Sequence, residues 1–182
     1  MPSIFRDLEV FNLLKVLEFA EKLDEKVEVD LYIPFKMKFG LWDESKEHTV
    51  YWRTGDSRKS LFEVGIGKDS GKIRSLTLVQ AKPVVQGLQK CVDEKMMPSK
   101  IGIPICDVGE FPANGFIDEA NDFQVCLSDD SILILFSEES HPISKIVCNR
   151  AIFGVDENNN MLSFQIVRLT ENEVNTLKSA LE

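Results

Sequence analysis

SLFEVGIGKDSGKIRSLTLV, residues 60–79, has the pattern of two β-strands joined by a tight turn. Phe62, Val64 and Ile66 alternate with Glu63 and Gly65, so one face of the first strand is apolar. The turn lies at residues 68–71, where glycine supplies the positive φ that closing a hairpin usually requires. A second alternating run follows and extends to residue 79. The segment therefore predicts a β-hairpin.

The length and composition are typical of a soluble globular protein. With 182 residues, 43% of them apolar and 28% charged, the chain predicts a single domain over residues 1–182 that needs no disulfide or metal to fold. No window approaches the roughly 18 uninterrupted apolar residues that a membrane span requires. The first residues, MPSIFRDLE, lack the basic-then-apolar order of a signal peptide, so we expect a cytoplasmic protein.

The net charge of −9 is concentrated in one part of the sequence. Residues 101–144 contain no Lys or Arg, and we call this segment the acidic window. Its acidic residues are Asp107, Glu110, Asp118, Glu119, Asp122, Asp129, Asp130, Glu138 and Glu139. Nucleic acid is disfavoured as a ligand because phosphate contacts need a basic surface. We expect a basic protein partner instead, since opposite fields speed association and suppress wrong pairings.

Several further strands follow from alternation along the chain. Every odd position from Val27 to Leu41 is apolar, which predicts one long half-buried strand. Pro34 cannot donate a hydrogen bond, so this strand lies at a sheet edge or bends there into two pieces. Other strands are expected at residues 50–53, 123–127, 132–136, 145–148, 151–156 and 161–169.

Helices are expected at the two ends of the chain. Ser3 can cap an N-terminal helix over residues 4–24, where apolar residues recur at helical spacing. Thr170 and Glu173 form a capping box that opens a C-terminal helix. Residues 83–98 fit a short helix or an irregular crossover. Residues 99–121 predict a long connection with at most one short strand, and such connections are often functional.

The halves 26–82 and 122–169 both contain two strands, a loop and two more strands. Residues 64–67 followed by 73–79 correspond to residues 153–156 followed by 162–167. The correspondence predicts two similar β-meanders, which pack as one sheet or as two. The alternative is that any two hairpins look alike at this level of detail.

Few residues carry recognisable catalytic or metal-binding patterns. Cys91, Cys106, Cys126 and Cys148 form no Cys-x-x-Cys pair, so a zinc site or redox motif is not supported. An enzyme site built on Cys148, His141 and an acid needs these groups adjacent in space, which their spacing does not require. The acidic loop at residues 118–122 lacks the Ca²⁺-loop pattern. We therefore expect no cofactor and no metal.

Two tryptophans are candidate anchors for a protein partner. Trp42 and Trp52 lie near the ends of the first predicted strands, and tryptophan is enriched at interface hot spots. The alternative is that each packs over the rim of a sheet.

The hairpin segments FEVGI (62–66), SGKI (70–73) and SLTL (75–78) resemble a pattern found in bacterial immunity proteins of polymorphic-toxin systems. The resemblance implies a small, acidic, cytoplasmic α+β protein that binds a cognate toxin domain and blocks it. It implies no catalytic residues.

Taken together, the sequence predicts an α+β protein with mainly antiparallel sheet and a helix at each end. The predicted function is non-catalytic protein binding, in which the acids of the acidic window, with Trp42 and Trp52, meet a basic partner. Two other functions stay open: a small hydrolase or transferase with a Cys/His site, and a structural module that self-associates through a strand edge near Pro34.

Overall fold

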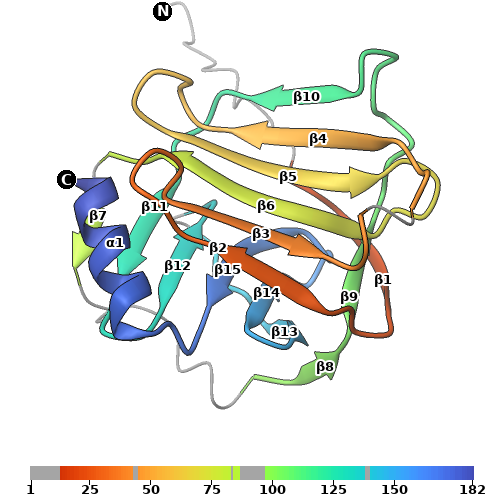
Figure 1. Cartoon of the computed structure of the whole chain (residues 1–182). Helices are drawn as coiled ribbons and strands as arrows, with labels where there is room; N and C mark the ends of the chain where they lie inside the picture. Colours follow the sequence, from red (N-terminus) through yellow and green to blue (C-terminus); the bar gives the residue numbers. More distant parts are fainter. Residues whose placement is uncertain (1–12, 43–44, 83, 87–96, 138–139) are drawn as a thin grey trace, which may run out of the picture.

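The protein is mostly β-sheet with one C-terminal helix (Figure 1). A computed structural model describes residues 13–42, 45–82, 84–86, 97–137 and 140–182. The first large sheet contains, in spatial order, β10 (Phe116–Glu119), β4 (Thr49–Thr54), β5 (Leu61–Gly67), β6 (Ile73–Gln80), β3 (Phe35–Phe39) and β2 (Glu25–Glu28). The second contains β7 (Val84–Gln86), β11 (Gln124–Leu127), β12 (Ile132–Leu135), β15 (Met161–Ile166), β14 (Ala151–Val155), β13 (Ser144–Cys148) and β8 (Ser99–Ile101). A separate pair consists of β1 (Val16–Ala20) and β9 (Ile103–Cys106), and the helix is α1 (Glu171–Leu181).

The two large sheets share one strand order. The order β10-β4-β5-β6-β3-β2 in the first sheet matches β8-β13-β14-β15-β12-β11 in the second, which has β7 in addition. In each sheet a hairpin is followed by a three-stranded meander, and the last meander strand pairs with the second hairpin strand. The outer strands β10 and β8 each pair in parallel with the first meander strand.

The correspondence reaches individual residues. Gly65 pairs with Ser75 in the first sheet and Gly154 with Ser163 in the second, and each pair is followed at once by a register shift. The positions matched from the sequence, 64–67 with 153–156, therefore occupy equivalent places in β5 and β14. The hairpins that precede these meanders and match each other are β2–β3 and β11–β12. A common origin of the two halves stays a prediction.

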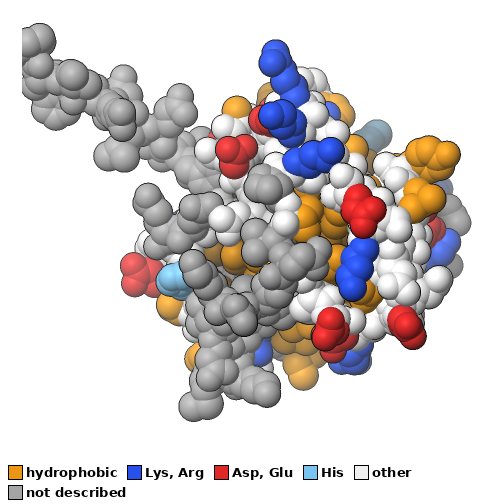
Figure 2. Space-filling model, turned by 90° about the vertical axis from the view of Figure 1, so that its left-hand side faces the viewer, with side chains coloured by type: hydrophobic (Ala, Val, Ile, Leu, Met, Phe, Trp, Pro, Cys, Tyr) orange, Lys and Arg blue, Asp and Glu red, His pale blue; other side chains and the backbone are white. Residues whose placement is uncertain are grey.

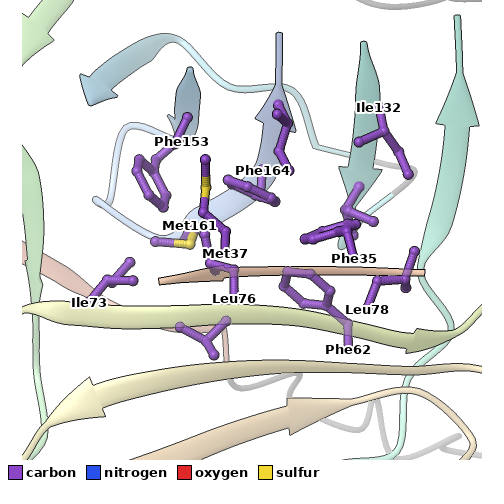
Figure 3. Packing of buried hydrophobic residues seen from close by; sticks show 14 of the residues in the cluster. Phe35, Met37, Phe62, Ile73, Leu76, Leu78, Ile132, Phe153, Met161 and Phe164 are labelled. Carbon is purple, nitrogen blue, oxygen red and sulfur yellow. The ribbon is translucent and has the colours of Figure 1, made fainter. Parts of the chain in front are cut away.

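The hydrophobic core lies between the two sheets (Figure 3). Phe35 and Phe62 from the first sheet meet Phe164 from the second, with ring centroids 5.9 and 6.0 Å apart. Phe153 continues this row of rings, 5.5 Å from Phe164. All four side chains are fully buried, so one apolar cluster holds the two sheets together.

The β-hairpin predicted at residues 60–79 is confirmed. β5 and β6 are antiparallel neighbours, and Gly71 in their turn has a φ of +70°. A side chain there would also collide with the backbone of Cys106, whose N–H donates to the Gly71 carbonyl oxygen at 2.7 Å. Glycine is therefore required at position 71 for two reasons: the turn needs a positive φ, and the close approach of β9 leaves no room for a side chain.

The predicted N-terminal helix over residues 4–24 is wrong where the structure describes it. Residues 1–12 lie outside the described part, and Val16–Ala20 form β1, which pairs with β9. Val16 is buried but Leu17 is 58% exposed, so the apolar residues do not form one buried helical face. The antiparallel partner β9 supplies the backbone hydrogen bonds that a helix would otherwise have made locally. The fold is therefore more β than the α+β class predicted.

The apolar pattern from Val27 to Leu41 belongs to two strands, which confirms the alternative that the chain bends near Pro34 into two pieces. β2 and β3 form an antiparallel pair, and the chain reverses between residues 29 and 34. Odd-numbered residues of β2 pair with odd-numbered residues of β3, as Val27 does with Met37. The apolar residues of both strands therefore have odd numbers, and in the sequence the two strands resemble one continuous strand. Pro34 is buried just before β3, which lies inside the sheet, whereas β2 is the last strand of that sheet. Self-association through a strand edge near Pro34 stays a prediction.

The segment 99–121 holds more structure than expected. It contains β8, β9 and β10, whereas at most one short strand was predicted. Residues 84–86 form β7, parallel to β11, and residues 87–96 lie outside the described part. The strands predicted at residues 123–127, 132–136, 145–148 and 151–156 are confirmed within a residue or two, while the strand predicted at 161–169 ends three residues earlier, at Ile166.

The C-terminal helix is confirmed together with its capping box. The Thr170 side chain accepts a hydrogen bond from Glu173 N, and the Glu173 carboxylate accepts one from Thr170 N. Val174, Leu177 and Leu181 face the core. The carboxylate of Glu173 also binds Arg150, which ties the helix to the turn between β13 and β14.

Candidate functional site

Three acids of the acidic window meet around one groove. Asp107 and Glu110 come from the connection between β9 and β10, and Glu119 comes from β10 itself. The groove has a volume of about 640 Å³, and its apolar lining includes Phe111, Pro112, Phe116, Ile117, Leu13 and Leu14. We call this feature the acidic groove. It combines carboxylates at its rim with an apolar floor.

Backbone contacts fix the β9–β10 connection. Asp107 N donates to the carbonyl oxygen of Lys15 at 2.8 Å, and the Asp107 carboxylate accepts from Gly109 N at 2.9 Å. Gly115 N donates to the Pro112 carbonyl oxygen at 2.9 Å and completes a turn just before β10. The acids of the groove therefore stand on a segment that is anchored at both ends.

Lys15 is the one cation among the described residues that line the acidic groove. It precedes β1, and its backbone contact with Asp107 brings the N-terminal side of the chain to the groove. The carboxylates therefore outnumber the positive charge, and the groove favours a cationic ligand.

Asp118 has a different role from the groove acids. It lies on the outer face of β10, where its carboxylate accepts two hydrogen bonds from Arg53, at 2.6 and 2.9 Å. The Arg53 guanidinium also lies over the Phe116 ring, 4.4 Å from its centre. The hydrogen bond to Asp118 raises the pKa of Arg53 further above its usual range. Asp118 is thus already paired within the protein.

The remaining acids of the window do not join this groove. Asp122 is exposed after β10, while Asp129 and Asp130 lie in the β11–β12 turn of the other sheet. The Asp130 carbonyl oxygen accepts from Leu169 N, which places this turn beside the start of α1. Glu138 and Glu139 lie outside the described residues. The acidic window is therefore continuous in sequence but divided between the two sheets in space.

Trp52 is buried rather than exposed, although it contributes to the lining of the acidic groove, so a partner-binding role for it stays a prediction. It is 2% exposed and packs edge-on against Phe136 with the ring centroids 5.4 Å apart. It points inward because it alternates with Tyr51 and Arg53 along β4. Trp42 is half-buried: its Nε1 donates to the Arg74 carbonyl oxygen, and the Arg74 guanidinium lies 4.5 Å from its ring centre. Trp42 thus covers a buried arginine.

The cysteine chemistry considered from the sequence finds little support. Cys148 is fully buried, and its thiol donates to the Leu23 carbonyl oxygen. Burial raises the pKa of Cys148, and it raises the pKa of Cys106 to about 12, so both stay as neutral thiols near pH 7. His141 is exposed in the loop before β13. Across the described ranges, no group of three or more His, Cys, Asp or Glu side chains is arranged to hold a metal ion.

A second hollow of about 650 Å³ lies beside α1 and has more cations than acids in its lining. Lys59, Lys82 and Lys178 line it together with Glu182 and with Val84, Leu127 and Leu181. Figure 2 shows this side of the molecule, with Lys and Arg side chains gathered near the top and hydrophobic side chains at the centre. No local pattern in the sequence marks this hollow, because its lysines come from three distant segments.

The apolar floor of the acidic groove was also missed. Its parts come from residues 13–14 and 111–117, which the pairing of β1 with β9 brings together. No local signal in the sequence marks a contact between segments so far apart.

Neither the protein-family models nor the curated proteins searched include a match to this chain. The one helix in the described part of the chain, α1, is too short and too polar to cross a membrane.

Proposed function

We propose that this protein is a binding protein whose acidic groove holds a basic segment of a partner protein. The observation that carries the proposal is the meeting of Asp107, Glu110 and Glu119 around one apolar floor. Carboxylates steer a cationic partner and fix its orientation, while burial of apolar surface supplies affinity. An arginine or lysine side chain suits both features, because it has an aliphatic stem and a charged head.

The protein contains an internal example of such a contact. Arg53 lies over the Phe116 ring while Asp118 holds its guanidinium. Phe116 lines the acidic groove as well as carrying Arg53. A partner arginine over Phe111, with Glu110 or Asp107 as its carboxylate, would repeat the same combination of ring and acid.

The finer form of the proposal is an immunity role. The partner would then be a basic toxin domain, and the acidic groove would neutralise it by covering its basic surface. The negative net charge and the hairpin resemblance at residues 60–79 support this form.

The test is affinity capture from a lysate of the organism that makes the protein, followed by quantitative mass spectrometry. The groove variant carries Asp107→Lys, Glu110→Lys and Glu119→Lys. The control carries Asp129→Lys, Asp130→Lys and Glu157→Lys, which changes the net charge equally at exposed turns. Asp118 is left out because its replacement would also break the pair with Arg53.

We expect wild type and control to retain one basic protein in stoichiometric amount, and the groove variant to retain at least tenfold less. Three charge reversals at one interface are large enough for this loss, since like charges brought together cost several kcal/mol. Equal retention by the groove variant and the control would overturn the proposal.

A further inference from the structure

Among the residues that the structure describes, β10 has a strand neighbour, β4, on one edge only. Tyr51 N of β4 donates to the carbonyl oxygen of Gly115 at 2.8 Å, which fixes the register of the parallel pair. In a parallel pair, every second residue directs its N–H and its C=O to the neighbouring strand. The N–H and C=O groups of Phe116 and Asp118 therefore point away from β4. Phe116 N donates to its own turn, at Asn114 Oδ1, 3.1 Å away.

The backbone N–H and C=O of Asp118 have no hydrogen-bond partner among residues 13–42, 45–82, 84–86, 97–137 and 140–182. The side chain of Asp118 is engaged by Arg53 instead. The middle of β10 therefore offers one donor and one acceptor to an incoming chain. An unpaired strand edge of this kind is a ready template for another strand.

The unpaired edge belongs to the same strand that lines the acidic groove. Phe116, Ile117 and Glu119 line the groove, whereas Asp118 is not part of its lining and pairs with Arg53. An extended segment laid beside β10 would direct alternate side chains towards the groove and towards Asp118. Its alternate side chains would meet carboxylates on the groove side.

The second sheet supplies a comparison within the same molecule. β8 holds the position equivalent to β10 and is also parallel to its neighbour, β13. Its residues are Ser99, Lys100 and Ile101, so it offers a strand edge with a cation and without an acid. Charge complementarity therefore selects β10 over β8 for a basic segment.

We propose that the partner binds by strand addition, in which an extended segment with alternating Lys or Arg residues pairs with the unpaired edge of β10. Backbone hydrogen bonds to Asp118 give affinity, and the basic side chains reach Asp107, Glu110 and Glu119. This inference rests on the proposed function, because it assigns the way in which the acidic groove takes its partner.

The probe is a capped octapeptide of alternating Lys and Val, with a peptide of alternating Glu and Val as its control. The decisive comparison is Asp118→Pro against Asp118→Ala. Both remove the pair with Arg53, but only proline removes the N–H that points away from β4. Proline is tolerated at an edge position whose N–H faces outward, so the β4 ladder stays intact. Ile101→Pro makes the equivalent change on β8.

Binding is measured by fluorescence anisotropy at low salt. We expect saturable binding of the Lys peptide alone, at least tenfold weaker for Asp118→Pro than for Asp118→Ala, and unchanged for Ile101→Pro. Equal affinity of the two Asp118 variants, with binding still lost in the groove variant, would overturn strand addition and leave the proposed function standing. Absence of binding to wild type would overturn strand addition, while the lysate capture decides the proposed function separately.

Hydrogen exchange of the wild-type protein covers the case in which Asp118→Pro does not fold. We expect the Asp118 amide to exchange at least tenfold more slowly when the Lys peptide is bound. An exchange rate that does not change at saturating peptide would overturn the inference.

Discussion

Gly65 and Gly154 occupy equivalent positions in the two sheets, and each allows a close approach of two neighbouring strands. At each, a Cβ atom would overlap the hydroxyl oxygen of the serine across the strand pair, Ser75 or Ser163. Gly154 also lies beneath Pro142, whose ring a Cβ would approach to 2.9 Å. Because the register shifts directly after both glycines, each marks a bulge where the backbone comes close to its neighbour.

We expect Gly65→Ala to lower the free energy of unfolding by about 1–3 kcal/mol, the usual cost of overpacking. Adding Ser75→Ala removes the overlapping hydroxyl, so the double variant should regain about 1 kcal/mol or more. Gly154→Ala should be rescued less completely by Ser163→Ala, because Pro142 stays in place. Urea unfolding of the six variants measures this, and strictly additive effects would contradict the assignment.

At the scale of elements, alternation predicted the strands that lie inside the sheets and failed at their margins. β5, β6, β14 and β15 each have two strand neighbours and were predicted as strands, although β6 and β15 are buried along almost their whole length rather than at alternate residues. β1, β8, β9 and β10 are short and get their backbone partners from distant segments. Residues 16–20 therefore fitted a helical spacing equally well, and only the pairing with β9 decides between helix and strand.

The candidate site, too, depends on contacts between distant segments, which the sequence does not reveal. Charge alone located Asp107, Glu110 and Glu119 as partner-binding candidates, and that role stays a prediction. The sequence does not separate them from Asp118, because the Arg53 partner arrives through the pairing of β10 with β4. It does not separate Trp52 from Trp42 either, since burial depends on which face of β4 meets the second sheet.

The helix α1 has a pH-dependent anchor in Glu173. Burial raises the pKa of Glu173, but hydrogen bonds from Arg150 and Thr170 more than offset it and hold the pKa below its usual range. A carboxyl with a lowered folded-state pKa stabilises the fold above its unfolded pKa, and this stabilisation is lost as the pH falls through the folded value. Glu173→Gln should therefore cost about 1–2 kcal/mol at pH 7, and the cost should shrink below about pH 4.

Urea unfolding at pH 7 and pH 3 measures this difference, with the exposed Glu157→Gln as control. The control should stay within about 0.5 kcal/mol of wild type at pH 7. A cost for Glu173→Gln that is the same at both pH values would show that the charge of Glu173 does not act through Arg150.

At the scale of the whole molecule, the two sheets depend on one set of aromatic rings. Phe62 lies within about 6 Å of the rings of Phe35, Phe123, Phe136 and Phe164, which come from both sheets and the segment before β11. Because this cluster is continuous, we expect both sheets to unfold in one cooperative transition, as the single-domain prediction requires.

Phe62→Ala should lower the free energy of unfolding by about 3–5 kcal/mol, through lost burial and the cavity left behind. Tryptophan fluorescence, which follows the first sheet, and helical circular dichroism, which follows α1, should shift to the same new midpoint. The partly exposed Phe116→Ala, at the edge of the first sheet, should cost clearly less. Two separate midpoints in Phe62→Ala would mean that the halves unfold independently.

The late position of β10 in the chain has a consequence for synthesis on the ribosome. β4 leaves the ribosome early, but its parallel neighbour β10 lies beyond β7, β8 and β9 in the chain. At about 5–20 residues per second, the nascent first half waits several seconds with that side of β4 uncovered. Tyr51 and Arg53 direct their backbone groups to that side, and Trp52 is also not yet enclosed because Phe136, against which it packs, is made later still. A nascent chain halted before residue 116 should therefore be a good substrate for chaperones that bind exposed apolar strands, and the finished protein a poor one.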